Sequence, residues 1–207
     1  MNNLQKRILT TLIVLPLSIF FVIKGGYFLS FFLIFILFAG MYELFSTFKK
    51  IKSILFLSLI LALSLFSAYY LRESIIIGAL LIYFAIAVSI SSDIGGYVFG
   101  KVFKWKKLTK ISPNKTISGL IGSFLFSLTL VPFIYKYLGN INLFSLIFIV
   151  IIISLTTQLG DLFISYLKRK AKVKDTSNIL PGHGGFLDRI DGIIFAIPVG
   201  ILLFNYI

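Results

Sequence analysis

The side chains best suited to chemistry lie in the C-terminal part of the chain. Asp161, Ser165 and Lys168 are spaced at i, i+4 and i+7, so a helix would carry a carboxylate, a hydroxyl and a cation along one face. Two more carboxylates, Asp188 and Asp191, follow at a spacing of i, i+3. Carboxylates bind Mg²⁺, while lysine and arginine bind phosphate oxygens. The pattern therefore predicts a site for a magnesium ion and phosphate groups.

A glycine-rich segment, residues 181–185, lies between Lys168 and Asp188. Its sequence Pro-Gly-His-Gly-Gly allows the backbone to approach a ligand closely. The same composition is also typical of a plain turn into the next helix. Taken alone, His183 is more often an ordinary loop histidine than a catalytic one, so both interpretations stay open.

A second polar segment lies further upstream. Between residues 101 and 110, five cations surround Trp105, as in a segment that rests on anionic lipid headgroups. The next residues instead concentrate hydroxyl groups, an amide and one lysine: Ser112, Asn114, Lys115 and Thr116. That composition favours directed hydrogen bonds to a phosphate or a nucleotide. For residues 101–110, binding of lipid alone is an equally good interpretation.

One apparent nucleotide-binding motif is rejected. Residues 95–102 follow the P-loop pattern except at the last position, where Val102 replaces the required serine or threonine. The segment also follows an apolar stretch of membrane-helix character rather than a buried strand. We therefore expect no P-loop, and the sequence contains no zincin, Rossmann or nucleophile-elbow motif.

The composition shows what kind of protein must position these residues. Of the 207 residues, 58% are hydrophobic and only 13% are charged, and the mean hydropathy is +1.03. These values exclude a water-soluble globular protein and a disordered one. The chain has no cysteine, so it has neither disulfides nor thiolate metal sites. In a membrane protein, the net charge of +13 indicates cytoplasmic loops and anionic lipids or substrates rather than nucleic acid.

The apolar residues gather in segments near the length of about 20 residues that a membrane-spanning helix needs. Seven such segments are expected: residues 8–23, 27–48, 54–71, 74–92, 117–138, 141–167 and 189–207. The sequence thus predicts an all-α polytopic membrane protein with about seven transmembrane helices. The first segment follows Lys6 and Arg7, as a signal peptide would. It lacks a small-residue cleavage site and runs through Lys24 into the second segment, which favours a retained helical hairpin.

The positive charges predict the orientation of these spans. All but three of the 20 lysines and arginines fall on one side, the exceptions being Lys24, Arg72 and Lys136. Because positive residues concentrate in cytoplasmic loops, the N-terminus is expected inside and the C-terminus outside.

The same topology gathers acidic side chains near the cytoplasmic face: Glu43, Asp93, Asp161, Asp175, Asp188 and Asp191. Carboxylates at the border of a membrane are costly and usually functional. Pairing with the nearby cations is the simpler alternative, but pairing alone gives no reason for the acids to gather on one side. Glu73 is the one acid expected outside.

Residues 165–191 carry three motifs with fixed spacing: Ser165-Tyr166-Leu167-Lys168-Arg169, Lys174-Asp175 and Pro181-Gly182-His183-Gly184-Gly185-Phe186-Leu187-Asp188-Arg189-Ile190-Asp191. This run resembles the signature of the phosphatidate cytidylyltransferases, also called CDP-diacylglycerol synthases. Further positions are similar to the family: Asp93, Tyr97, Gly100-Lys101, Leu108, Ile111-Ser112-Pro113, Lys115-Thr116, Gly119 and Gly160-Asp161-Leu162, and more weakly Glu43. The chain departs from the family at Asn114 and Ser118, and it is shorter in its N-terminal part.

The resemblance implies transfer of a cytidylyl group from CTP to phosphatidic acid, which gives CDP-diacylglycerol and pyrophosphate. It implies Mg²⁺ on Asp161 and Asp188, with Lys168 as a third catalytic residue. A second cation is expected if a further carboxylate joins them: Asp93, Asp175 or Asp191. The implied substrate-binding residues are Ser112, Asn114, Lys115, Thr116, Ser165, Arg169, Lys174, His183 and Arg189.

The same resemblance sets the expected organisation and partners. One integral-membrane domain is expected over residues 1–207, with N-terminal helices in 1–92 and the catalytic region in 93–207. The expected partners are CTP, phosphatidic acid, membrane lipids and a second copy in a homodimer, with no nucleic acid. The protein is expected to be located in the cell's inner or plasma membrane, with its active site facing the cytoplasm.

Two alternatives remain at this point. A related enzyme would use CTP on another lipid phosphate, such as an isoprenoid ether lipid, because nothing in the motifs distinguishes acyl from ether chains. A transporter would use its intramembrane acids as a pathway. The transporter is disfavoured, because the acids crowd one face and no inverted repeat is visible.

Overall fold

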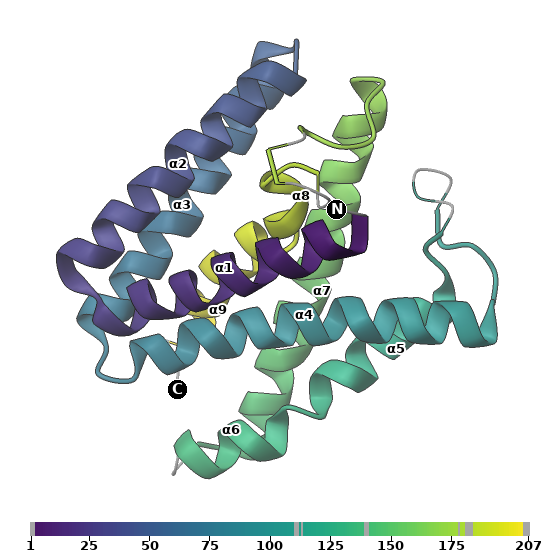
Figure 1. Cartoon of the computed structure of the whole chain (residues 1–207). Helices are drawn as coiled ribbons and strands as arrows, with labels where there is room; N and C mark the ends of the chain where they lie inside the picture. The colour runs from purple at the N-terminus through teal and green to yellow at the C-terminus, as the bar shows by residue number, and fades with distance from the viewer. Residues whose placement is uncertain are drawn as a thin grey trace. The chain divides into compact units, whose positions relative to one another are not determined.

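The computed structural model describes residues 3–109, 112, 114–138, 141–177, 179–180 and 184–204. These residues form helices joined by turns and loops (Figure 1). The helices are α1 (Asn3–Lys24), α2 (Gly26–Thr47), α3 (Ile51–Ser74), α4 (Gly78–Phe103), α5 (Ile117–Leu128), α6 (Val131–Leu138), α7 (Leu143–Lys170), α8 (Leu187–Ile190) and α9 (Ile193–Phe204). The chain divides into two compact units: unit 1 comprises residues 1–79 and 167–191, and unit 2 comprises residues 80–166 and 192–207.

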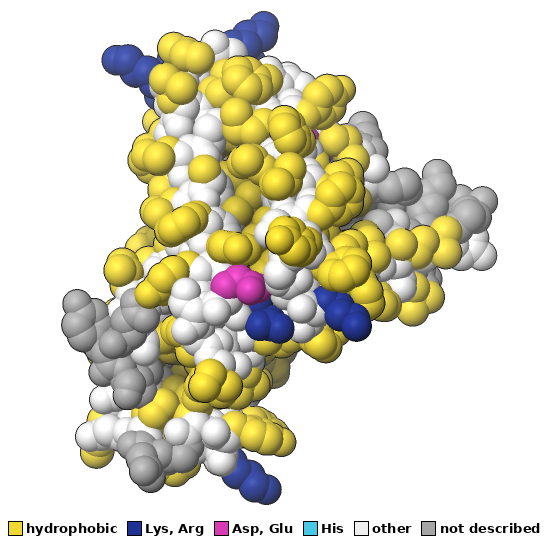
Figure 2. Space-filling model, turned by 90° about the vertical axis from the view of Figure 1, so that its left-hand side faces the viewer, with side chains coloured by type: hydrophobic (Ala, Val, Ile, Leu, Met, Phe, Trp, Pro, Cys, Tyr) yellow, Lys and Arg dark blue, Asp and Glu magenta, His cyan; other side chains and the backbone are white. Residues whose placement is uncertain are grey.

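The expectation of an all-α polytopic membrane protein is confirmed. Within the described residues, five segments are long and apolar enough to cross a membrane: α2, α3, α4, α7 and the 22-residue segment Ile117–Leu138, which contains α5 and α6. The first and last predicted spans correspond to α1, whose apolar part Leu9–Lys24 is shorter, and to α9, which has 12 residues. Hydrophobic side chains cover most of the face drawn in Figure 2, as expected for surfaces that meet lipid.

Some predicted boundaries differ from the structure. Helix α4 begins at Gly78 and continues to Phe103, so the rejected P-loop segment 95–102 is helical. The predicted span 117–138 is interrupted between α5 and α6. The predicted span 189–207 is also interrupted, because α8 ends at Ile190 and a turn precedes α9. Hydropathy is continuous across the break between α5 and α6, so it cannot reveal that break. The break between α8 and α9 lies at Asp191 and Gly192, beside the charged residues that begin the predicted span.

Unit 1 contains a helical hairpin that α3 holds at its turn. Gly25, with φ of 66°, connects α1 to α2. The Arg72 guanidinium donates to the carbonyls of Val22 and Ile23 at 2.7 Å each, and Glu73 Oε1 accepts from the Gly26 amide at 2.7 Å. These bonds satisfy backbone groups that helix ends leave without partners.

Unit 2 is held together by small residues and buried hydroxyl groups. On α4, Ser89 and Ser92 form 2.9 Å hydrogen bonds with Thr157 and Ser154 of α7. Helix α4 also approaches α5 closely, because a Cβ added to Gly95 would lie only 2.3 Å from the Gly122 carbonyl oxygen. Small residues and interhelical hydrogen bonds are the usual means of packing helices in lipid. This packing fixes the elements that carry Asp93 and Asp161.

Candidate active site

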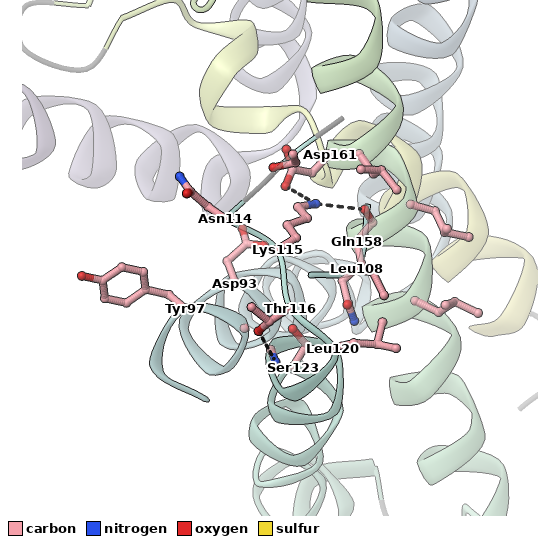
Figure 3. A pocket seen from close by; sticks show the side chains of 16 residues that line it. Asp93, Tyr97, Leu108, Asn114, Lys115, Thr116, Leu120, Ser123, Gln158 and Asp161 are labelled. Atoms are coloured by element: carbon pink, nitrogen blue, oxygen red, sulfur yellow. Dashed lines mark hydrogen bonds and ion pairs between the residues drawn. The ribbon is translucent and has the colours of Figure 1, made fainter. Parts of the chain in front are cut away.

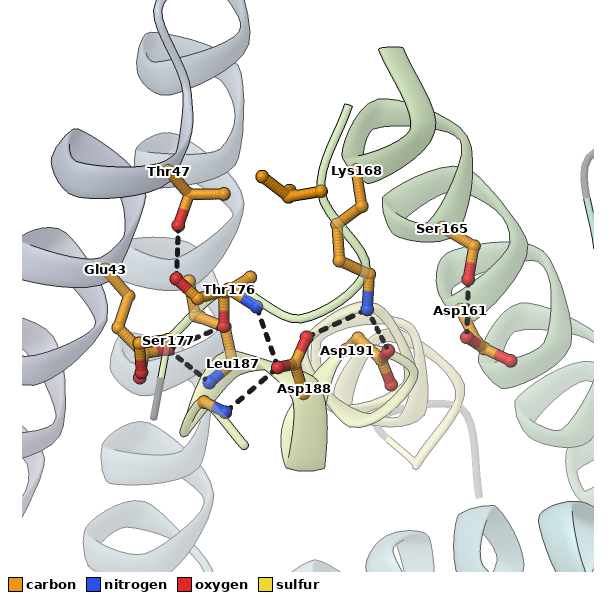
Figure 4. Close-up of polar contacts among 12 residues, drawn as sticks. Glu43, Thr47, Asp161, Ser165, Lys168, Thr176, Ser177, Leu187, Asp188 and Asp191 are labelled. Carbon is orange, nitrogen blue, oxygen red and sulfur yellow. Dashed lines mark hydrogen bonds and ion pairs between the residues drawn. The ribbon is translucent and has the colours of Figure 1, made fainter. Parts of the chain in front are cut away.

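Unit 1 contains a buried cluster around Asp188, at α8 (Figure 4). The Lys168 ammonium donates to Asp188 Oδ1 at 2.9 Å and lies 3.7 Å from Asp191 Oδ2. Asp188 Oδ2 accepts from the backbone amides of Thr176 and Gly185 at 2.8 and 2.9 Å. The Asp188 side chain is only 4% exposed. The cluster therefore combines two carboxylates with one buried cation.

The charge state of Asp188 follows from this environment. Burial raises the pKa of its carboxyl group, since it disfavours the charged form. The hydrogen bonds from Lys168, Thr176 and Gly185, together with the positive charge of Lys168, act in the opposite direction and outweigh burial, so the pKa of Asp188 lies below its ordinary value. Asp188 is thus a carboxylate at neutral pH.

Glu43 of α2 belongs to the same unit and is completely buried. It accepts hydrogen bonds from the hydroxyls of Thr176 and Ser177 and from the amides of Phe186 and Leu187 (Figure 4). The sequence predicted Glu43 only as one of the acids near the cytoplasmic face and as a weak family position, without a specific role. The available signal was a lone acid within a helix that is otherwise almost entirely apolar.

Unit 2 contains a second cluster, around Asp161 of α7 (Figure 3). The Lys115 ammonium lies 2.6 Å from Asp161 Oδ2 and 3.4 Å from the Gln158 carbonyl oxygen. Ser165 donates to Asp161 Oδ1 at 3.3 Å. Both charged side chains are partly exposed, at 26% and 29%, so this ion pair is accessible to a polar ligand.

A pocket of about 330 Å³ opens beside this ion pair. Its polar lining includes all four residues of the predicted polar segment together with two predicted carboxylates: Asp93, Ser112, Asn114, Lys115, Thr116 and Asp161. Leucine side chains form much of the remaining wall. The Thr116 hydroxyl also accepts from the Gly119 amide at 3.0 Å and caps the start of α5. The pocket can therefore hold a ligand with both polar and apolar parts.

The other predicted site residues lie as follows. Arg169 is exposed and donates to the Val173 carbonyl at 3.0 Å. Lys174, Asp175 and Arg189 are exposed. His183 lies outside the described residues. Asp161, Ser165 and Lys168 all lie on α7, with the predicted helical spacing.

Both clusters contain carboxylate oxygens, the kind of donor atom that Mg²⁺ prefers. Among the described residues, no three Asp, Glu or His side chains converge as a complete metal cage. Mg²⁺ does not need such a cage, because it usually takes one or two carboxylates together with substrate phosphates. Asp161 and Asp188 each hold a lysine ammonium, at 2.6 and 2.9 Å respectively. Each of these carboxylates therefore lies in contact with a positive charge, that of Lys115 or Lys168.

The fold defines an integral membrane protein, and each of its two units carries a cluster of charged side chains of the kind that binds phosphate groups or their metal ions. Residues 46–207 match the sequence model of the Cytidylyltransferase family, so the chain belongs to that family. The resemblance found in the sequence is confirmed.

Curated relatives support the same assignment. The chain is 45% identical over 121 residues to a phosphatidate cytidylyltransferase of Staphylococcus haemolyticus, covering 57% of this chain and 46% of the relative. It is 44% identical over 133 residues to that of Staphylococcus saprophyticus, with 63% and 51% covered. It is 48% identical over 111 residues to that of Staphylococcus aureus, with 52% and 42% covered. The chain thus spans about half the length of the curated relatives it matches.

Proposed function

We propose that this chain transfers the cytidylyl group of CTP to phosphatidic acid and releases pyrophosphate, with its site facing the cytoplasm. The observation that carries the proposal is the pocket at Lys115 and Asp161, in a chain that belongs to the Cytidylyltransferase family. The names of the staphylococcal relatives support the choice of lipid.

The proposed reaction makes modest demands on acid–base catalysis. An oxygen of the lipid phosphate attacks the α-phosphorus of CTP, a new P–O bond forms, and the bond to the β-phosphate oxygen breaks as pyrophosphate leaves. The attacking oxygen is already anionic near neutral pH, so no strong base is needed. The difficulty lies in bringing two polyanions together, and catalysis of such reactions is mostly positioning and charge neutralisation.

We assign the residues to these tasks as the sequence predicted. Asp161 and Asp188 are proposed to bind Mg²⁺, which would neutralise charge on the triphosphate. Asp93, Asp175 and Asp191 are candidates for a second cation. Lys168 is proposed to act on the reacting phosphates, and Lys115 and its neighbours in the pocket to bind the nucleotide or the lipid phosphate. A homodimer remains part of the proposal.

A product assay tests the proposed function. The purified protein in detergent is incubated with CTP, Mg²⁺ and either phosphatidic acid or an ether-lipid phosphate. We expect CDP-diacylglycerol and pyrophosphate in equal amounts from phosphatidic acid. Faster conversion of the ether lipid would reassign the substrate, and no nucleotide-linked lipid from either would contradict the proposal.

Two groups of lysines are expected to respond differently to mutation. Lys106 and Lys107 are exposed, whereas Lys115 contacts Asp161 in the pocket. Replacing Lys106 and Lys107 together by alanine should lower activity several-fold on anionic vesicles only, and high salt should abolish the difference because exposed charges are screened. Lys115→Ala should lower activity about tenfold or more even in neutral detergent micelles, because it removes a charged hydrogen-bonding group.

The assay compares both variants with the unmodified protein in anionic vesicles and in neutral micelles, at low and high salt. If Lys115→Ala behaves like the Lys106 and Lys107 double variant, residues 112–116 belong to a lipid anchor and do not bind substrate.

A further inference from the structure

Glu43 is a buried acid that the proposed reaction does not use. It lies near the end of α2, outside the residues 46–207 that match the family. None of its surface is exposed. Burying a carboxylate is costly unless hydrogen bonds compensate it, so the groups that face Glu43 indicate what it does.

Both oxygens of Glu43 bind the loop that leads to α8. Oε1 accepts from the Ser177 hydroxyl and, at 2.7 Å, from the Phe186 amide. Oε2 accepts from the Thr176 hydroxyl at 3.1 Å and from the Leu187 amide at 2.8 Å. One carboxylate thus ties the two ends of the segment 176–187 together.

The same segment holds Asp188. Thr176 connects the two acids directly, because its hydroxyl donates to Glu43 while its amide donates to Asp188 Oδ2 at 2.8 Å. Gly185 lies between them: a Cβ added there would come within 3.0 Å of both Glu43 Oε2 and Asp188 Oδ2. The Thr47 hydroxyl, one turn further along α2, donates to the Thr176 carbonyl at 2.6 Å and completes the attachment.

We infer that Glu43 is a positioning residue that fixes the carboxylate of Asp188 and the backbone around it. The inference rests on the proposed function, in which Asp188 is a metal ligand. Glu43 uses both oxygens within the protein, so it has no role in contacting substrate. Glu43 acts on the reaction indirectly, because it holds Thr176 and the backbone amides next to Asp188 in place. A metal ligand must be held in place by such supporting hydrogen bonds to be effective.

Glu43→Gln is the most informative change, because glutamine keeps the shape but offers only one accepting oxygen. Each oxygen of Glu43 accepts from one backbone amide and one hydroxyl. A hydroxyl can rotate to accept from the new NH₂ group, but a backbone amide cannot. Whichever way the glutamine is turned, the amide of Phe186 or of Leu187 loses its acceptor.

Glu73→Gln is the matched control. Glu73 also accepts from a backbone amide, that of Gly26. Gly26 begins α2, so along the helix it lies roughly 25 Å from Glu43 at 1.5 Å per residue. The control therefore makes the same chemical change in the same unit, on α3, where Glu73 contacts the end of α2 that is far from Glu43.

The experiment measures hydrogen exchange and activity of the full chain in detergent. In Glu43→Gln we expect exchange at Phe186 or Leu187 to rise about tenfold or more, as for loss of a buried hydrogen bond. We also expect a lower kcat per folded molecule and a higher Mg²⁺ concentration for half-maximal activity. Glu73→Gln should change none of these. If Glu43→Gln does not fold, Ser177→Ala, which removes one donor, should show smaller changes in the same directions.

Each outcome decides the inference. Unchanged exchange at Phe186 and Leu187 would overturn the attachment itself. Faster exchange with an unchanged kcat and Mg²⁺ dependence would make Glu43 a purely structural residue, which also overturns the inference. Absence of any transfer by the unmodified chain would instead contradict the proposed function, and the exchange data would still show whether Glu43 holds the loop.

Discussion

Replacing Asp161 or Asp188 by asparagine is expected to lower kcat by about 10³-fold or more, the scale seen when a key electrostatic stabiliser is lost. Asparagine keeps the shape of the side chain but removes the charge that would hold Mg²⁺. The measurement is the initial rate of CDP-diacylglycerol formation at saturating CTP over a range of Mg²⁺ concentrations, with Glu73→Gln as the control. Near-normal turnover of either variant would remove that residue from the site.

The two variants should differ in stability. Asp188 accepts from two backbone amides and from Lys168, and its side chain is almost fully buried. Asp161 bonds only side chains in the contacts described, and it is 29% exposed. We therefore expect Asp188→Asn to lower the thermal unfolding temperature more than Asp161→Asn, so rates must be compared per folded molecule.

Lys168→Ala is expected to lower turnover by about 10²-fold, because it removes the buried cation that contacts Asp188 and lies 3.7 Å from Asp191. Arg169→Ala should lower turnover by no more than about fivefold, since an exposed interaction contributes little. Arg169 is exposed and donates to a backbone carbonyl. The two residues are adjacent in sequence, so Arg169→Ala is a matched control.

The same product assay compares these two variants at equal amounts of folded protein. If Arg169→Ala has the larger effect, then the argument that Lys168 shares the helix face of Asp161 and Ser165 is wrong as a guide to catalysis.

The sequence predicted those parts of the fold that depend on local composition. Long apolar segments predicted α2, α3, α4 and α7, and the i, i+4, i+7 spacing placed Asp161, Ser165 and Lys168 correctly on one helix. The break between α5 and α6 was missed because hydropathy does not change there. The break between α8 and α9 was missed because the charged residues beside it, Asp188, Arg189 and Asp191, also fit the cytoplasmic end of one longer span.

Contacts between residues far apart in the chain could not be predicted from the sequence. Residues 112–116 were predicted as a separate polar segment, whereas Lys115 forms an ion pair with Asp161 and shares one pocket with it. The hydrogen bonds of Glu43 join residues 133 to 144 positions apart. Such contacts depend on how distant segments of the chain fold back onto one another, which periodicity and composition do not encode.

Isotope transfer from CTP tests the central claim most directly. The purified chain in detergent is given phosphatidic acid, Mg²⁺ and CTP labelled either at the α-phosphate or at the γ-phosphate. Cytidylyl transfer predicts that the α-label enters the lipid while the γ-label leaves in pyrophosphate, and that a chelator of Mg²⁺ abolishes both. Entry of the γ-label into the lipid, or retention of both labels in CTP, would contradict the account.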